Sequence, residues 1–186
     1  MDDANPTIDK KTADFIRRQP VFFVSTAPLS TDGFLNLSPK GLDSFRILDS
    51  SQVAYADYVG SGVETVAHVK ENGRIVLMFC AFDENPGIIR LHGKARVIEA
   101  SEPEFDQWIC HFPARDGVRS VIVVDCHRVA RTCGFGVPLM TFERHRDELP
   151  QWCDRQGEKG LANYQRRKNT ISLDGLPGIN VSRSGD

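Results

Sequence analysis

The chain has 186 residues, of which 40% are hydrophobic and 26% are charged, a composition typical of one soluble globular domain with or without an appended terminal segment. Its formal charge of -2 gives no basic excess for binding nucleic-acid phosphates, and no apolar run approaches the roughly 20 residues of a membrane span. We therefore expect neither a nucleic-acid partner nor a membrane span. The first residues lack the basic and apolar regions of an export signal, which predicts a cytoplasmic location.

Short apolar runs bounded by turn residues predict a mainly β chain. A helix is expected first, and it ends before Pro20 because the residue before a proline disfavours helical backbone. Six short strands interrupted by few helices favour a closed antiparallel barrel over a doubly wound parallel sheet, with the first two strands as a hairpin. The helices are predicted over residues 7–18, 102–111, 144–156 and 159–168, the strands over residues 21–26, 34–40, 52–58, 74–82, 88–99 and 118–130, and an irregular tail over residues 169–186.

A glycine-rich turn at residues 60–62 stands between the third strand and a short predicted helix. Ser61 and Glu64 have the S-x-x-E spacing of a capping box, and residues 72–73, Asn-Gly, supply a stop. Because the first turn of a helix has unpaired N–H donors, this arrangement is typical of an anion site. Thr65 replaces the third glycine of a dinucleotide fingerprint, which argues against a Rossmann nicotinamide site. From spacing alone, a tight turn with a capped helix fits equally well.

The cysteines and histidines are scattered. The sequence has no C-x-x-C, H-x-x-x-H or H-E-x-x-H pair, and no G-x-S-x-G turn for a serine nucleophile. We therefore predict no disulfide framework and no metal centre, and we expect most of the cysteines to be small buried apolar groups. The five cysteines are Cys80, Cys110, Cys126, Cys133 and Cys153.

One face of the fifth predicted strand is a row of cationic side chains, since alternate residues of a strand share a face. Such a row fits a phosphate site, and it fits the solvated face of a barrel strand as well. Whether the row contacts a phosphate stays open at this point. Its members are Arg90, His92, Lys94 and Arg96.

The end of the second predicted strand has a second candidate for ligand binding. Pro39 removes a ladder donor and Gly41 lets the chain turn, so the strand ladder should break here. A broken ladder would leave the Ser38 hydroxyl and the Lys40 ammonium free to meet a polar ligand. The alternative is an ordinary strand end with an exposed lysine.

The order of these motifs resembles the pyridoxamine 5'-phosphate oxidase-like family of flavin-binding split barrels. The resemblance rests on the apolar strand 21–26, Leu-Ser-Pro-Lys-Gly at 37–41, Tyr-Val-Gly-Ser-Gly-Val-Glu-Thr at 58–65, Asn-Gly-Arg-Ile-Val-Leu-Met-Phe at 72–79 and Leu-His-Gly-Lys-Ala-Arg-Val at 91–97. It extends over about two thirds of the chain, and the series of motifs is more specific than any one of them.

The resemblance implies a fold, a cofactor and an activity. The fold would be a mainly β (α+β), six-stranded antiparallel split barrel over residues 1–135, followed by a helical extension and tail over residues 136–186. The protein would be a homodimer that binds FMN at the subunit interface. It would be an FMN-dependent oxidoreductase that transfers hydride or electrons to or from an unidentified small molecule.

The resemblance also implies which residues hold the cofactor. Ser38 and Lys40 would lie along the flavin and its phosphate, while Ser61, Gly62 and Thr65 would offer backbone and hydroxyl donors. No acid or base is implied, and no metal. The full implied cofactor-binding set is Leu37, Ser38, Pro39, Lys40, Tyr58, Ser61, Gly62, Glu64, Thr65 and His68.

Two departures from the family pattern argue against pyridoxamine phosphate as the substrate. Residues 63–65 read Val-Glu-Thr where the true oxidases have basic residues, and no histidine follows the basic residues 166–168 as in their Arg-x-His substrate motif. A non-catalytic flavin-binding redox sensor or carrier, and a relative that binds a deazaflavin or haem, are the alternatives to the oxidoreductase.

Overall fold

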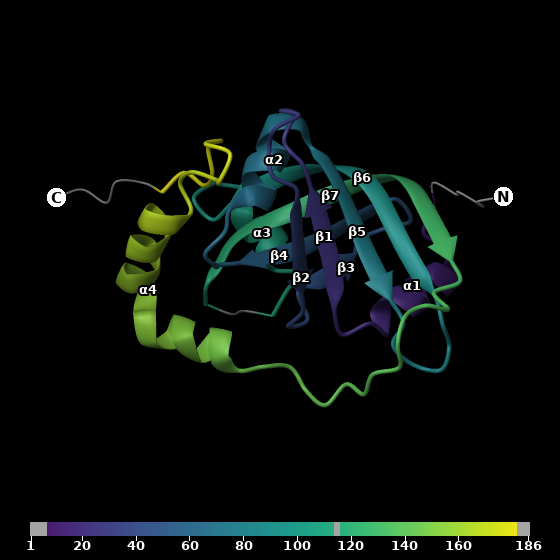
Figure 1. Ribbon diagram of the computed structural model, residues 1–186. Helices are drawn as coiled ribbons and strands as arrows, with labels where there is room; N and C mark the ends of the chain where they lie inside the picture. Colours follow the sequence, from purple (N-terminus) through teal and green to yellow (C-terminus); the bar gives the residue numbers. More distant parts are fainter. Residues whose placement is uncertain (1–6, 114–115, 182–186) are drawn as a thin grey trace.

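Seven antiparallel strands form one curved sheet in the order β2-β1-β5-β6-β7-β4-β3, as the computed structural model shows (Figure 1). The structure describes residues 7–113 and 116–181. β2 and β3 are the first and last strands of this order, and the barrel is split between these two edge strands. The strands are β1 (Phe22–Thr26), β2 (Asn36–Lys40), β3 (Phe45–Ile47), β4 (Gln52–Tyr58), β5 (Arg74–Cys80), β6 (Ile88–Glu99) and β7 (Val118–Thr132).

The sheet curls around the largest of the three apolar clusters in the described part of the chain. Side chains from the inner faces of both halves of the sheet belong to one buried cluster, among them Val24 of β1, Leu77 of β5 and Tyr55 of β4. The ring of Phe22 on β1 lies 5.2 Å from the ring of Phe45 on β3. Strands that are far apart in sheet order therefore face each other across the barrel interior.

The predicted fold class is confirmed, and its hairpin is the antiparallel pair β1 and β2. One strand was missed, because β3 has three residues and offers too short a run for alternation to show. Cys80, Cys126 and Cys153 are buried as expected, whereas the other two cysteines are exposed.

Within the described ranges, four helices flank the sheet (Figure 1). α1 (Lys10–Arg17) is preceded by its N-cap Asp9, whose carboxylate accepts the backbone N–H of Thr12 at 2.7 Å. α2 (Glu64–Asn72) ends at Gly73, which has the left-handed φ of 71° that glycine adopts readily. α3 (Phe105–Ile109) packs beside β4 and β7 on the outer side of the sheet.

α4 (Glu148–Lys168) lies to one side of the barrel and is bent within its length (Figure 1). Gly157 has φ 58° and ψ 178°, so the helical backbone is interrupted there, between the two helices that the sequence predicts. The first of them begins four residues later than expected. Cys153 and Leu161 of α4 are buried against Val59 at the end of β4. No helix in the described part of the chain is both long and apolar enough to cross a membrane.

Candidate functional site

A buried ion cluster, Lys40–Asp57–Arg119, joins β2 to β4 and β7 at the split of the barrel. The Asp57 carboxylate is fully buried and accepts hydrogen bonds from Lys40 Nζ at 3.0 Å and from Arg119 Nε at 2.8 Å. Burial by itself raises the pKa of Asp57, but Arg119 and Lys40 outweigh it and lower that pKa to about 2. Asp57 is therefore ionised at neutral pH, and the ion cluster has a net charge of one positive unit.

A polar network starts from Asn36 at the other end of β2 from Lys40. The Asn36 side-chain amide donates to Thr26 Oγ1 at 3.1 Å and to Thr65 Oγ1 at 2.9 Å. The buried His68 ring is 3.0 Å from Thr26 Oγ1 through Nδ1 and 2.9 Å from Asp174 Oδ2 through Nε2. These five side chains connect β1, β2, α2 and the chain after α4.

The capping box predicted from Ser61 and Glu64 is wrong. The residue before the first turn of α2 is Val63, and its side chain makes no capping hydrogen bond. The Glu64 carboxylate instead accepts the backbone N–H of Leu173 at 3.4 Å, and it lies so close to Gly62 that a Cβ there would collide with it. The start of α2 therefore already has a negative charge beside its N–H donors.

The C-terminal segment, residues 169–181, folds back over α2. Asn169 donates to the Gly60 carbonyl at 2.8 Å, and Lys70 of α2 donates to the Gly178 carbonyl. Asp174 accepts the backbone N–H of Phe34 at 2.8 Å as well as contacting His68. The bond from Phe34, followed by that from His68, lowers the pKa of Asp174. The segment thereby connects α2 to the loop between β1 and β2.

The predicted cofactor residues lie in several different parts of the structure. Lys40, Thr65 and His68 belong to the ion cluster or the polar network, and Ser38 shares the inner side of β2 with Lys40. Lys40 is neither free nor simply exposed, since it pairs with Asp57. Leu37 and Pro39 point outward from β2, and Ser61 and Gly62 are exposed in the turn before α2. Tyr58 is half-buried at the end of β4. Glu64 faces the C-terminal segment.

Sequence reasoning missed five members of the ion cluster and the polar network. These are Thr26, Asn36, Asp57, Arg119 and Asp174. Asp57 had a usable signal, because a carboxylate inside an otherwise apolar strand is rarely buried without a cationic partner. Asp174 had none, because it follows His68 by more than a hundred residues.

The cationic row of β6 lies on the outer side of the sheet and makes contacts within the protein. Arg90 donates to Thr132 at 3.2 Å, Lys94 donates to the Asn72 carbonyl at 2.8 Å, and Arg96 pairs with Glu104 at 3.4 Å. These contacts agree with the solvated-face interpretation of the row.

Three comparisons with known proteins place the chain in a family. A family model described as pyridoxamine 5'-phosphate oxidase matches residues 8–133. The pyridoxamine 5'-phosphate oxidase family protein ustO of Aspergillus flavus is 40% identical over 183 residues, which cover 89% of this chain and 73% of the relative.

Solved structures share the fold at low identity. A variant of HupZ from Group A Streptococcus superposes with a TM-score of 0.53 at 23% identity, covering 67% of this chain and 99% of its own. A Lactobacillus delbrueckii protein, provisionally described as a pyridoxamine 5'-phosphate oxidase, gives a TM-score of 0.53 at 18% identity, covering 69% of this chain and 97% of its own. With the family match over most of the barrel, these findings show that the chain belongs to the pyridoxamine 5'-phosphate oxidase family.

Proposed function

We propose that the protein is a homodimeric FMN-dependent oxidoreductase that acts on a small molecule. The observation that carries the proposal, beside family membership, is the surplus positive charge of the ion cluster at the split of the barrel. When bound, FMN supplies the hydride or electron transfer, and the protein supplies position and electrostatics. A cytoplasmic location stays a prediction.

The residues at the split fit a phosphate on the β2 side. The Lys40 ammonium has three N–H donors, of which Asp57 takes one, and its side chain is 19% exposed. Ser38 adds a hydroxyl on the same side of β2. A phosphate at the start of α2 would meet the Glu64 carboxylate instead, so we assign phosphate binding to Ser38 and Lys40 rather than to the helix.

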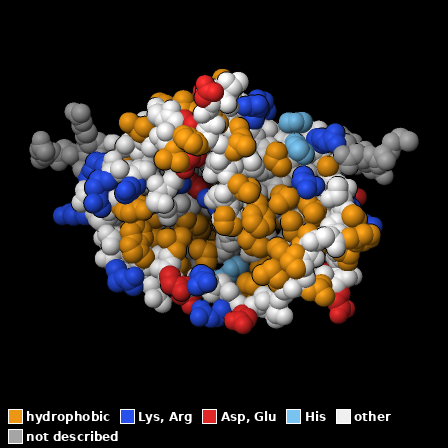
Figure 2. Space-filling view, viewed as in Figure 1, with side chains coloured by type: hydrophobic (Ala, Val, Ile, Leu, Met, Phe, Trp, Pro, Cys, Tyr) orange, Lys and Arg blue, Asp and Glu red, His pale blue; other side chains and the backbone are white. Residues whose placement is uncertain are grey.

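A hydrophobic surface on β2 and the two residues before it supports the homodimer. Leu35 and Leu37 are 81% and 68% exposed, and Phe34 and Pro39 are also exposed beside them. Figure 2 shows hydrophobic side chains gathered on the face of the molecule where β2 and β1 lie. Large exposed apolar groups that are contiguous mark interaction surfaces. We call this set, Phe34, Leu35, Leu37 and Pro39, the apolar face.

Titration of the full-length protein with FMN tests the cofactor. We expect quenching of flavin fluorescence, and Lys40→Gln should weaken FMN binding about tenfold because one charge-assisted contact to the phosphate is lost. Riboflavin, which lacks the phosphate, should bind the two proteins equally. Lys10→Gln removes an exposed lysine on α1 and serves as the matched control.

Two results of this titration would count against the assignment: no uptake of FMN by the unmodified protein, or an equal loss of FMN and riboflavin affinity in Lys40→Gln. Reduction of the bound flavin by NADH or NADPH then separates an enzyme from a flavin carrier. A bound flavin that no nicotinamide nucleotide reduces would favour the carrier.

Light scattering tests the homodimer. The expected mass is twice the 20.8 kDa of one chain, and Leu37→Asp should return it to that of one chain, since a carboxylate would be buried without a partner in the interface. The Leu37 side chain is mostly exposed in the single chain, so replacing it should leave the fold intact. Gln156→Asp on α4 adds the same charge away from the apolar face and should stay dimeric. A single-chain mass for the unmodified protein would refute the dimer.

A further inference from the structure

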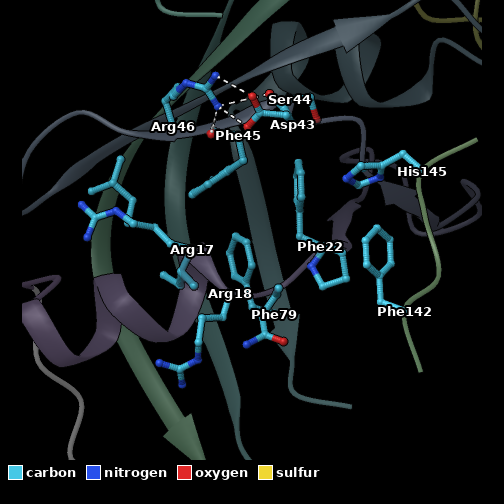
Figure 3. A pocket seen from close by; sticks show the side chains of 15 residues that line it. Arg17, Arg18, Phe22, Asp43, Ser44, Phe45, Arg46, Phe79, Phe142 and His145 are labelled. Carbon is cyan, nitrogen blue, oxygen red and sulfur yellow. Dashed lines mark hydrogen bonds and ion pairs between the residues drawn. The ribbon is translucent and has the colours of Figure 1, made fainter. Parts of the chain in front are cut away.

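A cavity of about 620 Å³ opens at the mouth of the barrel, between α1, β3 and residues 142–145 (Figure 3). We call it the barrel-mouth cavity. Its volume lies within the range of sites for small molecules. None of the residues to which we assign FMN binding lines it.

The floor of the barrel-mouth cavity is aromatic. The rings of Phe22, Phe45 and Phe79 contact one another, with centroids 4.9 to 5.5 Å apart. Phe142 adds a fourth ring from the segment before α4, and Figure 3 shows all four rings directed toward the same space. Aromatic rings of this kind favour a planar aromatic guest through edge and face contacts.

The rim of the cavity is positively charged. The rim is lined by Arg17 and Arg18 at the end of α1, by Arg46 of β3 and by the Asp43 carboxylate, so the three arginines exceed the carboxylate by two positive charges. Arg46 holds Asp43 through two bonds of 2.8 and 3.1 Å, so these two groups neutralise each other. The surplus charge therefore belongs to the two arginines of α1.

Those two arginines have only weak contacts within the described residues. Arg17 pairs with the exposed Asp14 at 3.2 Å, and Arg18 makes no ion pair within residues 7–113 and 116–181 but lies over the Phe15 ring, 5.9 Å from its centroid. Both side chains are exposed at the rim. Exposed ion pairs are weak, so a carboxylate can replace Asp14 as the partner of Arg17 at little cost.

The loop that forms one wall is held in an uncommon conformation. Leu42 and Asp43 have φ values of 63° and 56°, in the left-handed region that residues other than glycine rarely occupy. Arg46 fixes this loop, since it also donates to the Asp43 carbonyl at 3.1 Å. Strained backbone that its surroundings hold in place is a feature of ligand-binding walls.

We propose that the barrel-mouth cavity binds a planar aromatic carboxylate, its ring on the phenylalanine floor and its carboxylate at the rim that Arg17 and Arg18 line. Carboxylates are ionised at neutral pH, and arginine binds them with planar, paired donors. The proposal does not depend on FMN.

Calorimetric titration of the full-length protein with naphthoate tests the proposal, with naphthylmethanol as the uncharged analogue of similar shape. We expect one equivalent of naphthoate to bind and naphthylmethanol to bind at least fivefold more weakly. Absence of naphthoate binding at millimolar concentration, or equal binding of the two compounds, would overturn the proposal.

Matched variants locate the site. The double variant Arg17→Gln/Arg18→Gln should weaken naphthoate about tenfold and leave naphthylmethanol unchanged, whereas Arg155→Gln, an exposed arginine on α4, should change neither. Phe142→Ser should weaken both compounds, and Phe135→Ser, also an exposed phenylalanine but outside the cavity, should weaken neither. Thermal unfolding verifies that these surface variants fold. Naphthoate binding that is insensitive to both the arginine and the Phe142 variants would place it elsewhere and refute the assignment.

Discussion

Replacing Asp57 by asparagine should lower the free energy of unfolding at neutral pH by about 3–5 kcal/mol, because it removes one member of a buried ion cluster and leaves its partners without a counter-charge. The Arg119 side chain is only 3% exposed, so water cannot take over the role of the carboxylate. Asparagine keeps the shape of the side chain, and the loss therefore reports charge rather than packing. Urea unfolding at pH 7 gives the measurement.

A matched control for this substitution lies on β7. Asp125 is exposed and accepts a hydrogen bond from the Gln52 amide at 2.8 Å, so Asp125→Asn should change the free energy of unfolding by less than about 0.5 kcal/mol. Equal effects of the two substitutions would contradict the importance assigned to the ion cluster.

The same carboxylate should make stability depend on pH in acid. Its pKa is lowered from 3.8 to about 2 in the folded protein, so the stability it provides is fully present above pH 3.8 and is lost as the pH falls through 2. A shift of this size corresponds to about 2 kcal/mol. The Asp57→Asn variant lacks this contribution, so the difference in unfolding free energy between the two proteins should shrink from pH 4 to pH 2. A difference that stays constant would show that Asp57 titrates normally.

The elements that sequence reasoning predicted best are those specified by neighbouring residues. β4 and β6 have the predicted bounds, because the apolar run of β4, the period-two alternation of β6 and the flanking turn residues are local signals. α2 ends where Asn72 and Gly73 predicted, for the same reason. Its beginning was mispredicted, although the S-x-x-E spacing is present. The side chain of Glu64 is engaged by Leu173, a contact that no local pattern can show.

The candidate site was predicted only in part for a related reason. Lys40, Thr65 and His68 were selected for their chemistry, and all three are in the ion cluster or the polar network. Their partners come from distant parts of the chain, and a sequence pattern does not say which remote strand lies opposite. Lys40 was therefore expected to be free for a ligand, whereas Asp57 of β4 already binds one of its donors.

Replacing His68 by alanine should lower the free energy of unfolding by about 2–4 kcal/mol. The ring is fully buried, so its loss leaves a cavity and removes a partner from the Thr26 hydroxyl. The C-terminal segment should also open more often, because the contact between His68 and Asp174 connects it to α2. Hydrogen exchange of the backbone amides of residues 169–180 measures that opening.

Two conservative variants separate the contact with Asp174 from the filling of the core. The amide of His68→Gln has a nitrogen at the distance of Nε2 and retains the contact with Asp174, whereas the shorter His68→Asn reaches Thr26 only. If the contact with Asp174 holds the segment in place, exchange in residues 169–180 should stay slow in the glutamine variant and become faster in the asparagine and alanine variants. Equally fast exchange in all three would mean that packing of the ring, and not the contact with Asp174, holds the C-terminal segment over α2.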